Sequence, residues 1–193
     1  LPIPCRRCHF LFRIAGCGTV DIAFDFLQLL QSVGKSTPQH LFHACGGVGV
    51  AEGEPVKGVL RFDNPNSIDR IYGNHEGCIT TDRYPLPTLE GGLMPFTEET
   101  FKDDAIIVDQ CQIHSIEILD PKDARPVVTV DFNAPCVGIW TPYGKNAPFI
   151  CLEPWYGVHD RYEYSGQFRD KYLMNHLQPG ASFMSEYVIR IGE

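Results

Sequence analysis

The sequence predicts an all-β protein, built as one large antiparallel β-sandwich. Three observations support this class: many short segments rich in β-branched and aromatic residues, 15 prolines and 18 glycines that place turns between them, and little helical periodicity. With 193 residues, 44% of them hydrophobic and 21% charged, the chain is long enough to bury a sizeable core.

The elements follow from local patterns along the chain. Alternating apolar and polar residues at 13–15 and 19–26, separated by Gly16 and Gly18, predict a β-hairpin. Further strands are predicted at 58–62, 105–109, 113–119, 126–132, 137–141, 148–152 and 187–191. A helix is expected only at 170–177, and the long irregular stretch 64–95 is expected to be a loop that borders a site.

Charge and hydropathy exclude several classes of partner. The formal net charge of −8, without any basic cluster, argues against nucleic-acid binding. No apolar stretch is long enough for a membrane span, and the opening segment lacks a clear signal-peptide pattern. We therefore expect a cytoplasmic protein with a small neutral ligand, no nucleic-acid partner and no membrane contact.

Eight cysteines are scattered through a chain too large to need a disulfide scaffold, so free thiols are expected. Cys5, Cys8 and His9 form a CxxCH string, which is typical of covalent haem attachment and also supplies three potential zinc ligands. A haem site would need a secretory signal and helical surroundings, and a zinc site would need a fourth ligand. The interpretation we favour is coincidence, with no metal and no cofactor.

The segment 148–160, PFICLEPWYGVHD, is the best candidate for a functional site. Its apolar opening predicts a buried strand, and Pro154 is expected to end that strand with Glu153 held at its mouth. Trp155 adds a flat apolar face with one N–H donor. A carboxylate beside an indole is suited to binding a sugar. An equally ordinary explanation of the pair is structural: Glu153 forms a salt bridge and Trp155 packs at the strand end.

This segment, together with GIWTP at 138–142, KDDAIIVD at 102–109 and the ending at 177–191, resembles the aldose 1-epimerase (hexose mutarotase) family, in its Glu-Pro-Trp branch. Upstream, GKSTPQHLFHA at 34–44 is similar to the stretch that leads into the family's catalytic histidine. The resemblance implies a galactose-mutarotase-like β-sandwich over residues 10–193, shortened at its N-terminal side. Residues 1–9 stay unassigned.

The resemblance also implies a mechanism without metal or cofactor, acting on a small-molecule hexose. Glu153 matches the family's general base and His43 is in register with its general acid, with His40 or His75 as alternatives. Asp104 matches a hydroxyl-binding aspartate, and its other interpretation is a turn residue. In the carbohydrate-binding interpretation, a stacking surface would be formed by Trp155 and Trp140.

Two departures from the family keep several hypotheses open. The proline and aromatic that follow the family's histidine are missing after His43, and its N-terminal strands, with an arginine and a second histidine, have no counterpart before residue 10. The chain is therefore a hexose mutarotase, a non-catalytic carbohydrate-binding relative, or a shortened member whose open sheet edge pairs with a second copy. A hexose phosphate would need a cation near Trp155, and the candidates are Arg161, Arg169 and Lys171.

Overall fold

The structure is a computed structural model that describes residues 55–73, 77–147 and 149–192, and the backbone of 7–15 and 20–22. This part of the chain contains strands, three short 3-10 helices and no α-helix, and all paired strands are antiparallel. The predicted all-β class is confirmed. None of the helices in these ranges is long and apolar enough to cross a membrane.

The elements are, in chain order, β1 (Arg7–Ala15), β2 (Val20–Ile22), β3 (Lys57–Phe62), β4 (Asp69–Arg70), β5 (Tyr84–Pro85), η1 (Glu90–Gly92), β6 (Leu93–Thr97), η2 (Glu98–Phe101), β7 (Ile106–Val108), β8 (Ser115–Leu119), β9 (Pro126–Phe132), β10 (Cys136–Trp140), β11 (Cys151–Trp155), η3 (Phe168–Asp170), β12 (Asn175–Leu177) and β13 (Ser182–Ile191).

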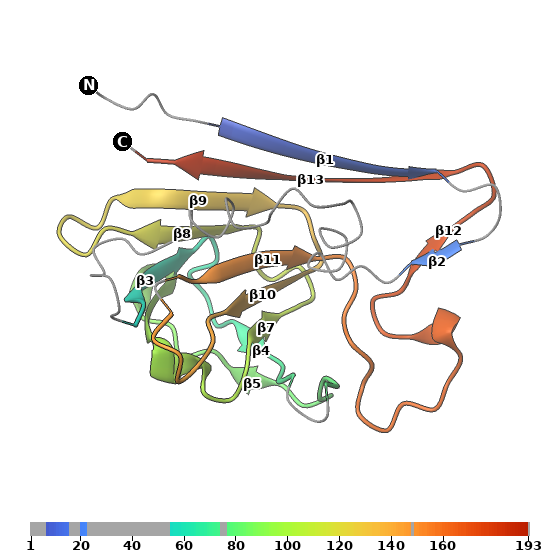
Figure 1. The fold of residues 1–193 in the computed structure, drawn as a ribbon, viewed down its shortest axis with the longest axis horizontal. Helices are drawn as coiled ribbons and strands as arrows, with labels where there is room; N and C mark the ends of the chain where they lie inside the picture. The colour runs from blue at the N-terminus through green and yellow to red at the C-terminus, as the bar shows by residue number, and fades with distance from the viewer. Residues whose placement is uncertain (1–6, 16–19, 23–54, 74–76, 148, 193) are drawn as a thin grey trace.

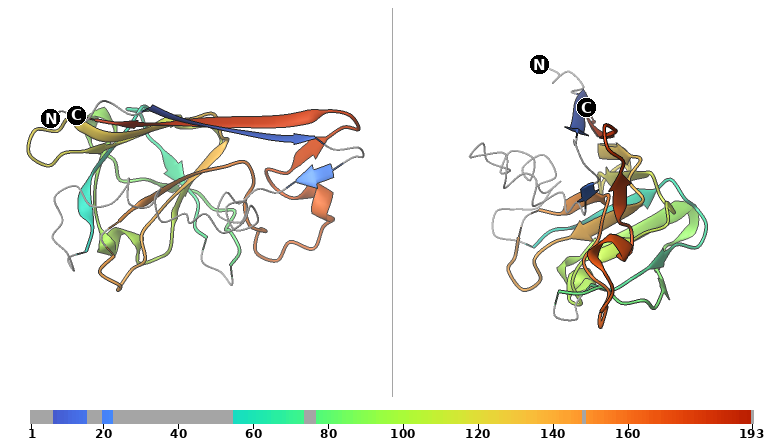
Figure 2. Two further views of the ribbon diagram at one scale, coloured as in Figure 1. Left: turned by 45° about the horizontal axis from the view of Figure 1, so that its top comes forward. Right: turned by 90° about the vertical axis from the view of Figure 1, so that its right-hand side faces the viewer.

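Two sheets form the body of the molecule (Figure 1). The large sheet has the order β1-β13-β9-β8-β3-β6 and the small sheet has the order β11-β10-β7. Only the second half of β13 pairs with β9, whereas β1 pairs with nearly the whole length of β13. The β1–β13 ribbon therefore runs past the end of β9, toward the short β2–β12 pair (Figure 2).

The main core lies between the two sheets, because strand residues alternate between faces and both sheets turn an apolar face inward. The small sheet contributes Ile106, Val108, Val137 and Ile139, each at most 1% exposed. The large sheet contributes mainly Leu60, Phe62, Met94, Phe96, Ile116, Ile118, Val128, Val130, Phe132 and Ile189.

The opposite face of the small sheet, called here the outer face, carries a second apolar cluster. Its strand residues are Ile107, Cys136 and Trp155. They are covered by Ile71 and Ile79 from the loop after β3, and by Val158, Tyr172 and Leu173 from the segment after β11. Two long connections, far apart in sequence, thus meet on the face that bears Glu153.

A buried carboxylate ties both connections to the sheet. Asp109, which directly follows β7, is fully buried and accepts two hydrogen bonds from the Arg83 guanidinium, at 2.6 and 2.7 Å. Its second oxygen also accepts a hydrogen bond from the Tyr172 hydroxyl at 2.6 Å. One side chain therefore holds the loop after β3 and the segment after β11 in a single arrangement, called here the Asp109 tie.

Most predicted strands are confirmed, including 126–132 with its bounds, but the expectations for the hairpin, the helix and the stretch 64–95 are wrong. The predicted hairpin is absent from the described backbone: β1 pairs with β13 and β2 with β12, so the two segments share no ladder. No α-helix forms at 170–177, where η3 ends and β12 follows. The stretch 64–95 is not wholly irregular, because it contains β4, β5, η1 and the start of β6.

We predict that Asp109→Asn lowers the free energy of unfolding by about 3 kcal/mol, because it leaves the Arg83 guanidinium half-buried without its counter-charge. The value is at the low end for a buried ion pair, since the Arg83 side chain keeps 28% exposure. Urea unfolding would measure it. The control is Glu117→Gln, which breaks the more exposed pair with Arg61 and should cost less than about 1 kcal/mol.

We also predict an acid-labile contribution from Asp109. Burial by itself raises the pKa of this carboxyl, but hydrogen bonds from Arg83 and Tyr172 outweigh it and hold the pKa below its ordinary value of 3.8. The unfolded chain then binds the proton first, so the stabilisation is complete above about pH 5 and is lost as the pH falls through the lowered pKa. Unfolding midpoints measured between about pH 5 and pH 2 should fall more steeply for the wild type than for Asp109→Asn.

Candidate functional site

Glu153 lies in the middle of β11, on the outer face of the small sheet. It pairs with Gly138 of β10, and its side chain is half-buried. The expectation that the strand ends before Pro154 is wrong, because β11 continues to Trp155. Pro154 is tolerated because β11 is an edge strand of the described sheet, where one side of the strand needs no N–H donor.

Trp155 orients the carboxylate of Glu153. Residues two apart on a strand share a face, and the Trp155 indole N–H donates a hydrogen bond of 3.2 Å to Glu153 Oε2. The indole itself is only 7% exposed. It packs closely against Gly138, where an added Cβ would lie 2.4 Å from its Cζ2 atom. Glycine is therefore required at this position for the indole to hold the carboxylate.

Trp140 lies on the same face. It pairs with Cys151, while Gly138 pairs with Glu153 and Cys136 with Trp155, so every second residue of β10 and β11 projects outward. The structure thus brings three predicted residues, Glu153, Trp155 and Trp140, onto one face. Trp140 is half-buried, so part of the residue is accessible.

Asp104 lies in the turn before β7, exposed and with φ 82°. Its Oδ1 accepts a hydrogen bond of 2.7 Å from the Ala105 backbone N–H. Such a local contact is typical of an aspartate in a turn, which is the alternative interpretation of Asp104 from the sequence. The register of Ile106 with Ile139 puts Asp104 at the Trp140 end of the small sheet.

The predicted general acid, His43, and its alternatives His40 and His75 lie outside the described residues. Cys5 lies outside them as well, and Cys8 and His9 are consecutive residues of β1.

Within the side chains that the structure describes, no three His, Cys, Asp or Glu residues are grouped as for a metal ion. Cys78, Cys111 and Cys136 are free thiols, as expected from the sequence. Burial is the main cause that raises the pKa of the Cys136 thiol, which favours the protonated, unreactive form.

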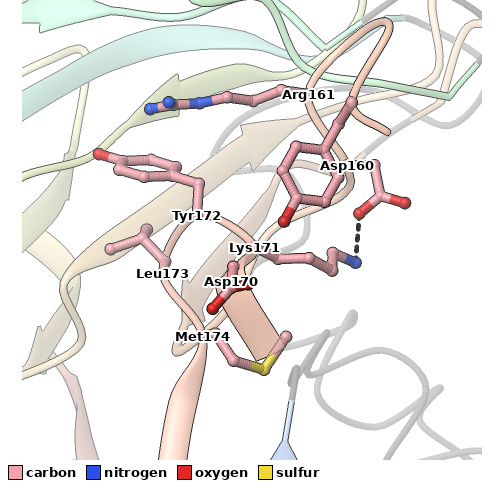
Figure 3. Close-up of a pocket in the computed structure, with 8 residues that line it drawn as sticks. Asp160, Arg161, Asp170, Lys171, Tyr172, Leu173 and Met174 are labelled. Carbon is pink, nitrogen blue, oxygen red and sulfur yellow. Dashed lines mark ion pairs between the residues drawn. The ribbon is translucent and has the colours of Figure 1, made fainter. Parts of the chain in front are cut away.

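A pocket of about 360 Å³ opens beside the outer-face cluster, in the segment after β11 (Figure 3). Its lining residues are Asp160, Arg161, Tyr164, Asp170, Lys171, Tyr172, Leu173 and Met174. Tyr172 and Leu173 also pack against the cluster that contains Trp155. The pocket and Glu153 are therefore on the same side of the small sheet.

Sequence reasoning missed the residues that frame this side of the molecule. The predicted strand 105–109 ends at Asp109, which in the structure directly follows β7, but no local pattern indicates Arg83 or Tyr172 as its partners. The available signal is that a carboxylate directly follows three apolar residues that are buried, Ile106–Val108. A carboxylate that is itself buried requires a partner.

Neither a family model nor a curated protein matches this chain. Two solved structures are similar to it. A galactose mutarotase related enzyme from Lactobacillus acidophilus has a TM-score of 0.61 and 22% identity, over 96% of this chain and 53% of that one. A galactose mutarotase-like protein from Lactobacillus casei has a TM-score of 0.62 and 23% identity, over 76% and 50%.

The fold is therefore the galactose-mutarotase-like β-sandwich that the sequence predicts. The chain spans about half the length of both similar structures.

We predict that Gly138→Ala displaces the Trp155 indole and costs about 1–3 kcal/mol of stability by overpacking. The Trp155 indole N–H resonance should shift as its bond to Glu153 is lost, and urea unfolding should report the cost. Trp155→Phe removes the clashing ring atoms, so the double variant should cost less than the sum of the two single changes. Strict additivity would contradict this packing.

Proposed function

We propose that the protein interconverts the α and β anomers of a hexose as an aldose 1-epimerase-like enzyme, with Glu153 as general base and His43 as general acid. The observation that carries the proposal is the Glu153 carboxylate, half-buried on the outer face and oriented by the Trp155 N–H. The fold and the relatives described as mutarotase-related support it.

The reaction needs one base and one acid on the same sugar. Glu153 removes the proton of the C1 hydroxyl while the imidazolium of His43 protonates the ring oxygen, so the C1–O5 bond breaks and the open aldehyde forms. Rotation about C1–C2 exposes the other face of the aldehyde. Closure returns both protons and gives the other anomer, without net gain or loss of atoms.

The surroundings of Glu153 suit the role of a base. The hydrogen bond from the indole N–H fixes one oxygen of the carboxylate, and a positioned base of this kind contributes roughly 10²- to 10⁴-fold in rate. Trp140 is half-buried, and its aromatic ring is proposed to pack against the apolar C–H face of a pyranose ring. Asp104, at the same end of the sheet, is proposed to accept hydrogen bonds from sugar hydroxyls.

We predict that polarimetry of freshly dissolved α-D-glucose and α-D-galactose shows faster equilibration with the protein than with buffer alone. Glu153→Gln should lower kcat by roughly 10²- to 10⁴-fold with little change in sugar affinity, because the amide keeps the shape and removes the base. His43→Ala should lower kcat in the same range.

The matched control is Glu90→Gln, which removes an exposed carboxylate in η1 and should leave the rate unchanged. Equilibration no faster than in buffer would refute the enzyme assignment. If calorimetry then still detected hexose binding that depends on Trp155, the protein would be a non-catalytic carbohydrate-binding relative.

A further inference from the structure

Arg161 is a prearranged guanidinium without an ionic partner among the described residues. Its Nε is one of two buried donor atoms that lack a hydrogen-bond acceptor there, the other being Nε of Arg70. Arg70 donates to the Tyr72 hydroxyl and lines no described pocket, whereas Arg161 lines the pocket beside the outer face. A guanidinium that lines a pocket and has no carboxylate paired with it among the described residues is available to a ligand.

Three contacts fix the place of Arg161. Its backbone is bridged to Ile79, which donates to Asp160 O at 2.8 Å and accepts from Tyr162 N at 2.9 Å. Its guanidinium carbon lies 4.0 Å from the centre of the Tyr172 ring, and Figure 3 shows the two groups stacked along the pocket wall. Tyr172 is in turn fixed by its hydroxyl on buried Asp109.

The Tyr172 platform keeps its form over the physiological pH range. Burial, and then the hydrogen bond to Asp109, raise the pKa of the Tyr172 hydroxyl to about 12. The ring therefore stays a neutral phenol whose face attracts the guanidinium, and the hydroxyl stays a donor to Asp109.

The other charges of the pocket do not neutralise Arg161. Lys171 is paired with Asp160 at 2.5 Å, so these two cancel each other. Asp170 is exposed and forms no ion pair with Arg161, from which it is separated in Figure 3 by Tyr172 and Leu173. A planar guanidinium presents a fork of N–H donors that matches the two oxygens of a carboxylate or phosphate.

We infer that the sugar substrate carries an anionic group, a phosphate or a carboxylate, which Arg161 binds in this pocket. The inference rests on the proposed function, because the pocket shares Tyr172 and Leu173 with the cluster around Trp155, whose indole orients Glu153. The sugar ring then lies over the outer face, and its charged substituent occupies the pocket.

Calorimetry with the full chain tests the inference, with glucose, glucose 6-phosphate, glucuronate and inorganic phosphate as probes. The wild type should bind one of the two anionic sugars at least about 10-fold more tightly than glucose, and the preferred one identifies phosphate or carboxylate as the anion. Arg161→Gln should lose roughly 10- to 100-fold in affinity for that sugar and leave glucose binding unchanged.

The matched control is Arg169→Gln, which removes an equal charge from exposed η3 outside the pocket and should change no affinity. Arg161→Lys keeps the charge without the fork and should lie between the wild type and Arg161→Gln, which covers the case in which the glutamine variant does not fold. Equal wild-type affinities for glucose and both anionic sugars, or a preference that survives in Arg161→Gln, would overturn the inference.

The two proposals fail separately. Acceleration of glucose anomerisation without any preference for an anionic sugar would refute the anion site and leave the epimerase assignment intact. Arg161-dependent binding of an anionic sugar, with no acceleration of its anomer exchange by nuclear magnetic resonance, would retain the anion site and refute the catalytic assignment.

Discussion

The buried Asp109 carboxylate is the constraint on which the outer face depends. A charge removed from water requires partners. Asp109 is paired with Arg83, which precedes it in the sequence, and accepts a hydrogen bond from Tyr172, which follows it. The main core between the sheets does not include this contact, since it is built from apolar residues, most of them on strands. The Asp109 tie instead decides where the two long connections lie, and with them the pocket and its Arg161 platform.

The other determinant of the site is the pairing of Gly138 on β10 with the side chains of β11. Gly138 leaves room for the Trp155 indole, whose N–H donates a hydrogen bond to Glu153 on the same strand. The absence of one side chain thus controls the orientation of a carboxylate on the neighbouring strand. Because both groups are on rigid strands, the carboxylate is more precisely placed than a loop would allow.

The two constraints meet at the outer-face cluster. Trp155 belongs to it from the strand side, and Tyr172 belongs to it from the segment after β11. The same apolar contacts therefore support a hydrogen bond to a candidate base and a stacked guanidinium. The galactose-mutarotase-like fold supplies the sheet, and the specific chemistry comes from the side chains on this one face.

The sequence by itself determined the all-β class, most of the strands and the segment that carries Glu153 and Trp155, because strand alternation and turn residues are local properties. Local patterns misled at 170–177, where the expected helix is replaced by a strand that pairs with distant β2. They also misled at Pro154, which an edge strand tolerates. Only the tertiary structure decided that Asp109 joins Arg83 and Tyr172, and that Arg161 is left without a described ionic partner, because such pairings link residues far apart in sequence and depend on how the whole chain packs.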